Sequence, residues 1–164
     1  MKKIIFLFFF INLIFGQPPT ISLNDLWNGN YNPVRLESVR SMKNGTQYTV
    51  LEKEGMSQAT IMRYDFGNPN DGVILFNTAD YPQVKSLSGY SFSKKEQKIL
   101  LETASDQIYR RSKQAIYWIY DLTSKELEKV VDAKIQEPLF SPDGTKIAYV
   151  YRRNLFVKEL QNQN

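Results

Sequence analysis

The sequence of 164 residues contains no cysteine and no histidine. Without cysteine the chain forms no disulfide and offers no thiol nucleophile or thiolate metal ligand. Without histidine it lacks the usual general base at neutral pH, the usual zinc ligand and one member of a Ser-His-Asp triad. Hydrolysis by these residues alone would need carboxylates or a Ser-Lys pair, and neither forms a recognisable motif. We therefore expect no cofactor, no metal site and no complete catalytic centre in this chain.

A strong charge of one sign is also missing. The chain has 21 Lys and Arg against 17 Asp and Glu, a net charge of +4. Setting aside Lys2 and Lys3, which lie in a segment that we expect to be removed, leaves 19 basic against 17 acidic residues. A nucleic-acid-binding protein usually shows a basic stripe or patch, whereas both signs are interspersed here. We expect no nucleic-acid partner.

The first 16 residues have the pattern of a secretory signal peptide. Two lysines precede an apolar run from Ile4 to Phe15, which only Asn12 interrupts and after which small Gly16 follows. The run is short for a membrane-spanning helix, although an uncleaved signal anchor is the alternative. We expect residues 1–16 to be a signal peptide, residues 17–164 to be the mature chain, and the protein to be secreted or periplasmic.

A short entry helix and loop are predicted over residues 20–32. Ser22 followed by Asp25 three residues later matches a helix capping pattern, and the turn residues 28–30 would end the helix. Beyond it the only helical pattern covers Lys125–Val131, which fits a turn and a strand end equally well.

The rest of the chain is rich in short apolar or β-branched runs separated by Gly, Asn, Asp or Pro. Aromatic residues make up 13%, which favours strands because flat rings pack well on a pleated surface. The predicted strands are residues 48–51, 59–64, 72–76, 98–101, 115–120, 147–151 and 155–157.

A repeat with a period near 50 residues runs through these strands. Its clearest copy is Phe140–Tyr149, a second is Phe92–Leu101, and Met42–Thr49 is a degenerate third. In the clearest copy Pro142 suits the second position of a type I turn, and Gly144 suits the left-handed position that follows. About four strands per repeat is the pattern of a β-propeller blade, with the hairpins of a β-sandwich as the alternative.

Some charged positions have a structural interpretation. Asp65, Asp121 and Glu159 recur at one place in successive repeats, and we interpret them as strand-end caps rather than a metal cluster. We interpret Arg152-Arg153 as an exposed pair in a hairpin turn. Asn44-Gly45-Thr46 reads as a turn rather than a glycosylated sequon.

Four passages together resemble the N-terminal β-propeller of dipeptidyl peptidase IV, a family of serine exopeptidases in the prolyl oligopeptidase superfamily. They are Tyr90–Ser93 with Ile99–Glu102, Tyr109–Ser112 with Tyr117–Leu122, Phe140–Val150, and Arg153–Lys158. The entry segment Ile21–Leu26 is also similar to the family's start. Residues 50–85 carry the resemblance least well.

The resemblance implies a substrate-binding residue. In that family an aromatic-Arg-x-Ser motif on a propeller loop faces the active-site cavity, and its arginine binds a carbonyl of the substrate's N-terminal dipeptide. The match here is Tyr109-Arg110-Arg111-Ser112, so Arg110 is the expected substrate-binding residue, with Tyr109, Arg111 and Ser112 beside it. Arg111 stands where the family often has His or Phe. The alternative is that Arg110 and Arg111 are solvated loop charges.

The sequence thus predicts an all-β fold, a partial β-propeller of about two to three four-stranded antiparallel blades after a short N-terminal helix. The function that the resemblance implies is that of an N-terminal propeller fragment of a secreted dipeptidyl peptidase, inactive by itself. Its partners would be a peptide substrate with a free N-terminus, a C-terminal α/β-hydrolase domain beyond Asn164, and a second copy in a homodimer. The alternatives are a non-enzymatic periplasmic binding or scaffold propeller and a stand-alone small β protein.

Overall fold

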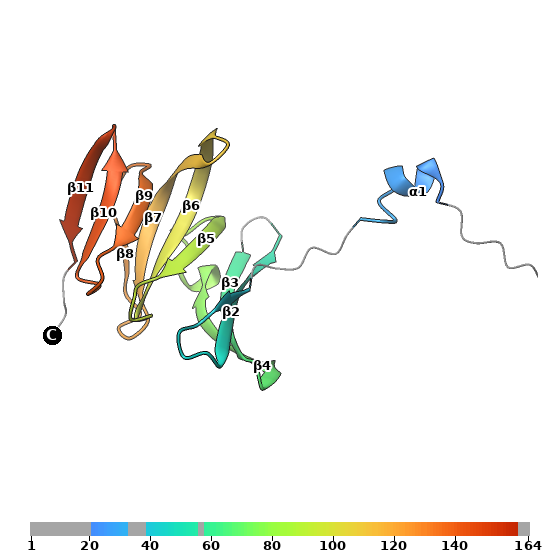
Figure 1. Ribbon diagram of the computed structural model, residues 1–164, viewed down its shortest axis with the longest axis horizontal. Coiled ribbons are helices and arrows are strands. Elements are labelled where there is room, and N and C mark those ends of the chain that lie inside the picture. Colours follow the sequence, from blue (N-terminus) through green and yellow to red (C-terminus); the bar gives the residue numbers. More distant parts are fainter. Residues whose placement is uncertain (1–20, 33–38, 56–57, 161–164) are drawn as a thin grey trace, which may run out of the picture. The chain divides into compact units, whose positions relative to one another are not determined.

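The computed structural model describes residues 21–32, 39–55 and 58–160 (Figure 1). The chain divides into two units, residues 1–36 and residues 37–164. The first unit contains helix α1 (Leu23–Trp27). Ser22 caps this helix, because its side chain accepts a hydrogen bond from the backbone N–H of Asp25, as the sequence predicts.

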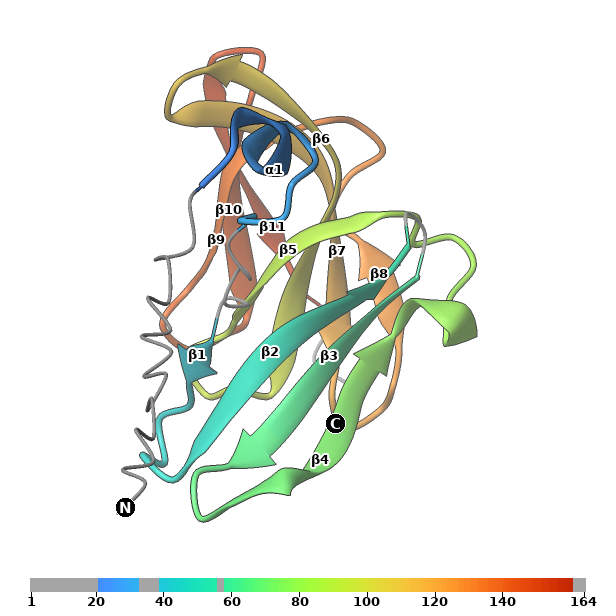
Figure 2. The ribbon, with the colours of Figure 1, turned by 90° about the vertical axis from the view of Figure 1, so that its right-hand side faces the viewer.

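The second unit consists of three antiparallel sheets. Each pairs strands in sequence order and is connected to the next by a short segment (Figures 1 and 2). The first sheet contains β1 (Arg40–Ser41), β2 (Gln47–Glu54), β3 (Gln58–Asp65) and β4 (Asn68–Asn77), and a 3₁₀ turn, η1 (Thr78–Asp80), follows it. The second contains β5 (Leu87–Phe92), β6 (Lys98–Tyr109), β7 (Ser112–Asp121) and β8 (Leu127–Lys129). The third contains β9 (Gln136–Phe140), β10 (Lys146–Tyr151) and β11 (Asn154–Glu159). This is the predicted partial β-propeller.

The second sheet packs against both neighbouring sheets, which explains why residues 99–101 of β6 and 115–120 of β7 form unbroken apolar runs. On β6, Ile99 and Leu101 belong to the core shared with the first sheet, whereas Leu100 belongs to the core shared with the third. On β7, Tyr120 faces the first sheet and Ile119 the third. Side chains that alternate between two cores fix the register of this blade, because a slip by one residue would exchange them.

The repeated turn has the predicted geometry in all three copies. Gly45, Glu96 and Gly144 have φ of +73°, +56° and +77°. Each donates its backbone N–H to the carbonyl three residues earlier, at 2.9 to 3.1 Å. The repeat therefore marks the same strand-connecting turn in each sheet.

The helical interpretation of Lys125–Val131 is wrong. Lys125 has φ of +62°, which ends any helix at once, and β8 follows from Leu127. The strand-end interpretation of this segment is confirmed. The predicted signal peptide, residues 1–16, lies outside the described residues. No helix in the described part of the chain is long and apolar enough to cross a membrane.

Candidate functional site

The predicted site residues all lie at one tip, that of the long β6–β7 hairpin. Tyr109 pairs with Ser112 across the hairpin, so Arg110 and Arg111 form its two-residue turn. Both arginines are exposed, and the Tyr109 side chain is 75% exposed. Neither arginine belongs to an ion pair among the described residues.

A β-bulge divides this hairpin into a buried root and an exposed tip. Thr103 pairs with Ile116 and Asp106 pairs with Gln114, so two residues of β6 oppose one residue of β7. The first of these two, Ala104, has φ of +48°, a conformation that alanine rarely adopts. From Ala104 to Tyr109 every residue of β6 is exposed. A bulge bends and twists the strand that carries it, so it sets the direction in which the arginine turn projects.

Glu102 closes the root of the hairpin immediately before the bulge. Glu102 is 9% exposed, and its carboxylate accepts three hydrogen bonds. Ser88 donates its hydroxyl at 2.9 Å, Lys113 donates its ammonium at 2.7 Å and Tyr117 donates its hydroxyl at 3.2 Å. The cluster ties β5, β6 and β7 together, because the donors come from both strands that flank β6.

The Glu102 carboxylate is ionised in this setting. Burial raises its pKa, but the hydrogen bonds from Lys113, Ser88 and Tyr117 and the Lys113 charge together lower it by more, so the pKa lies below its ordinary value. Burial and the adjacent Glu102 charge raise the pKa of Tyr117, which therefore stays a neutral donor. The cluster therefore holds the three strands together through hydrogen bonds to a charged carboxylate. It is not a general acid or base that titrates near neutral pH.

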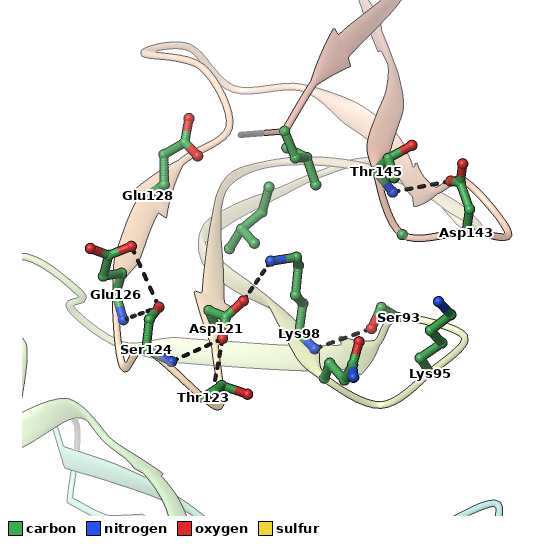
Figure 3. Close-up of a pocket in the computed structure, with 14 residues that line it drawn as sticks. Ser93, Lys95, Lys98, Asp121, Thr123, Ser124, Glu126, Glu128, Asp143 and Thr145 are labelled. Carbon is green, nitrogen blue, oxygen red and sulfur yellow. Dashed lines mark hydrogen bonds and ion pairs between the residues drawn. The ribbon is translucent and has the colours of Figure 1, made fainter. Parts of the chain in front are cut away.

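A cavity of about 600 Å³ lies at the opposite ends of β6 and β7, between the second and third sheets (Figure 3). At this end Lys98 pairs with Asp121 at 2.5 Å. Asp121 also accepts hydrogen bonds from the backbone N–H groups of Thr123 and Ser124, at 2.8 and 3.1 Å. The labelled side chains in Figure 3 carry both signs of charge. The central pair, Lys98 and Asp121, is already engaged in the contacts just described.

The predicted capping role of the recurring acids is confirmed for two of them. Asp121 caps the turn after β7 as described, and Asp65 accepts the backbone N–H of Gly67 at 2.8 Å after β3. Glu159 instead forms an exposed ion pair with Lys146. Within residues 21–32, 39–55 and 58–160 no three acidic side chains gather as a metal ion would require.

The structure therefore brings Tyr109, Arg110, Arg111 and Ser112 onto one exposed turn, and their role in substrate binding stays a prediction. Sequence reasoning missed Glu102. The available signal was an acidic residue at the end of the apolar run Ile99–Leu101, where an unpaired charge would be costly.

Comparison with known proteins agrees with this architecture. Residues 93–164 match the family model described as the dipeptidyl peptidase IV N-terminal region. A crystal structure of dipeptidyl peptidase 4 from Porphyromonas gingivalis superposes with a TM-score of 0.70 and 28% identity, over 87% of this chain and 20% of that one. These matches support a dipeptidyl peptidase IV N-terminal propeller region.

Curated proteins that are similar to this chain are named as peptidases. Prolyl endopeptidase FAP from Bos taurus is 32% identical over 146 residues, which cover 85% of this chain and 18% of the relative. Dipeptidyl peptidase 4 from Felis catus is 34% identical over 97 residues, which cover 58% of this chain and 13% of the relative. The chain thus spans about a fifth or less of the length of the relatives it matches.

Proposed function

We propose that this chain is the substrate-positioning part of a secreted serine-type peptidase that releases N-terminal dipeptides. The observation that carries the proposal is the exposed Tyr109–Ser112 turn within a dipeptidyl peptidase IV propeller region. Relatives named as dipeptidyl peptidases support the reaction class.

The chemistry of Arg110 suits a positioning role. A guanidinium is always charged and offers five N–H donors in a fixed plane, so it binds substrate carbonyl oxygens without exchanging a proton. Among the described residues Arg110 has no carboxylate partner that a substrate would need to displace. Holding the substrate in one pose lowers the entropic part of the barrier, and this effect requires no catalytic group in the chain.

Bond cleavage would come from groups outside this sequence, which has no histidine. We propose that a Ser-His-Asp set on an α/β-hydrolase domain follows in the full-length peptidase, and that residues 1–16 direct its export. Reading the coding sequence beyond codon 164 tests this part. A Gly-x-Ser-x-Gly motif followed by Asp and His is expected, and its absence would favour a non-enzymatic binding propeller.

The decisive experiment is steady-state kinetics of the full-length peptidase with Arg110→Ala. We expect kcat/KM for dipeptide release to fall by about 10- to 100-fold, since a hydrogen bond to a charged group contributes about 1.5–3 kcal/mol. Lys94→Ala, in an exposed turn at the opposite end of the same sheet, is the control and should leave kcat/KM unchanged. Equal activity of the Arg110→Ala enzyme and the wild type would refute the assigned role.

A further inference from the structure

The turn between β10 and β11 places two arginines in a backbone conformation that disfavours them. Tyr151 pairs with Asn154, so Arg152 and Arg153 alone make the turn. Their φ angles are +48° and +65°, and a two-residue turn of this kind is normally built from Asn and Gly. The short side chain of Asn can form a local hydrogen bond that compensates for the left-handed conformation, whereas the long side chain of Arg does not. The turn therefore carries strain that a different pair of residues would relieve.

This strained turn lies at the same end of the sheets as the Arg110–Arg111 turn. The β5–β6 turn, with Ser93 and Lys95, and the β9–β10 turn, with Asp143 and Gly144, line one cavity. The next hairpin turn of each sheet, Arg110–Arg111 and Arg152–Arg153, therefore lies at the end opposite that cavity. Figures 1 and 2 both show the two turns at the top of their sheets. The propeller end that carries the proposed substrate residue thus presents two arginine pairs on neighbouring sheets.

The four guanidinium groups are not neutralised within the described part of the chain, where every ion pair uses a lysine. The carboxylates nearest in the hairpin are already engaged, because Glu102 pairs with Lys113 and Asp106 pairs with Lys134. Glu137, exposed at a bulge in β9, is the acidic residue on the strand between the two turns. Arg152 lies over the Tyr151 ring at 5.1 Å, which orients it without cancelling its charge.

We propose that the Arg110–Arg111 and Arg152–Arg153 turns together form a cationic rim that selects peptide substrates with acidic side chains. The inference rests on the proposed dipeptidyl peptidase function and specifies its substrate class. Guanidinium groups bind carboxylates through paired hydrogen bonds, and a rim of uncompensated charge attracts acidic peptides before they dock. The strain at Arg152–Arg153 is what this rim costs in stability, since Asn-Gly would form the same turn without the charge.

The test uses the full-length peptidase and two hexapeptides that differ only in carrying Glu or Gln at positions three to six. We expect the wild type to show a higher kcat/KM for the Glu peptide, and the preference to shrink as salt rises from about 0.05 to 0.5 M. The double variant Arg152→Asn/Arg153→Gly should reduce the preference about two- to fivefold while kcat/KM for the Gln peptide stays constant. Its melting temperature should rise, because the turn is relaxed.

A matched control replaces two lysines of the opposite end, Lys94→Ala/Lys95→Ala, which removes the same charge and should leave the preference intact. An unchanged Glu-to-Gln ratio in the Arg152→Asn/Arg153→Gly enzyme overturns the inference. Loss of binding to phosphatidylserine vesicles in that variant would then assign the arginines to an anionic membrane instead. If the wild type releases no dipeptide from either peptide, the proposed function fails, and fluorescence anisotropy of both peptides binding to the protein decides the charge preference separately.

Discussion

The hydroxyl groups of Thr49 and Tyr90 lie 2.7 Å apart and join the first sheet to the second. Thr49 is fully buried and Tyr90 is 5% exposed, and the Arg40 guanidinium lies 4.7 Å from the centre of the Tyr90 ring. Burial raises the pKa of Tyr90, so its phenol remains protonated and able to donate. This contact is a buried hydrogen bond between the first two blades.

Tyr90→Phe should destabilise the protein by about 1–2 kcal/mol, because it leaves the buried Thr49 hydroxyl with only a 3.5 Å contact to the Arg40 carbonyl. Urea unfolding monitored by circular dichroism measures the change. Tyr109→Phe removes the same atom from a 75% exposed side chain and should be neutral. Equal midpoints for the two variants would show that the Thr49 contact contributes nothing.

Glu102→Gln should loosen the root of the β6–β7 hairpin. The amide keeps the size of the side chain but removes the charge that Lys113 faces, so we expect a loss of about 1–2 kcal/mol. Hydrogen exchange of the amides from 103 to 116 should become faster. Glu159→Gln is the control, because its ion pair with Lys146 is exposed and should contribute little. Unchanged exchange rates in Glu102→Gln would mean that the carboxylate does not order the hairpin.

The Glu102 charge also predicts a dependence of stability on acid. Its pKa in the folded protein lies below the ordinary 4.5, so the unfolded chain binds a proton more tightly than the folded one. The contribution is complete above about pH 4.5 and is lost as pH falls through the lowered folded pKa. The free-energy difference between wild type and Glu102→Gln should therefore narrow in acid. A constant difference at all pH values would contradict this assignment.

The repeated turn gives a prediction about one titrating side chain. The Ser141 hydroxyl donates to Asp143 at 2.5 Å and the Thr145 backbone N–H at 3.1 Å, and these bonds lower the pKa of Asp143 from 3.8 to about 2. Ser141→Ala should raise that pKa toward 3.8, as carboxyl carbon NMR shifts would report. Asp106 in the same spectra is the internal control and should not move.

Gly144→Ala isolates backbone strain in the same turn. Gly144 has φ of +77°, and an added Cβ would meet no atom within 4 Å, so any cost comes from the backbone alone. We expect Gly144→Ala to lower the free energy of unfolding by about 1 kcal/mol, as thermal unfolding would measure. Gly144→Asn should cost less, because Asn tolerates the left-handed region. Equal costs for both variants would show that the left-handed backbone conformation is not the cause.

The sequence predicted those parts of the fold that depend on local chemistry. The Ser22 cap, the left-handed Gly144 and the apolar runs of β6 and β7 follow from single residues or short periods, and the structure contains all of them. The strands β5 and β9 were not predicted, because Gly89 and Pro138 interrupt their patterns and packing between sheets decides their state.

The residues of the candidate site were predicted from the sequence, but their backbone conformation was not. The Tyr109–Ser112 motif located the turn, whereas the bulge at Ala104 and the positive φ angles of Arg152 and Arg153 have no signal in the residues involved. Strand pairing imposes those conformations, since the register fixes how many residues each turn contains.

Because every sheet pairs only neighbours in the sequence, the order of synthesis can also be the order of assembly. The strands of the first sheet end at Asn77, so they are synthesised before the arginine turns and leave the ribosome before them. Its apolar face, which contains Ile61 and Phe76, must then wait for β5 and β6 to emerge and cover it. Low contact order makes each meander quick to form, so the interval between completed sheets becomes the period when a nascent chain is most open to chaperones.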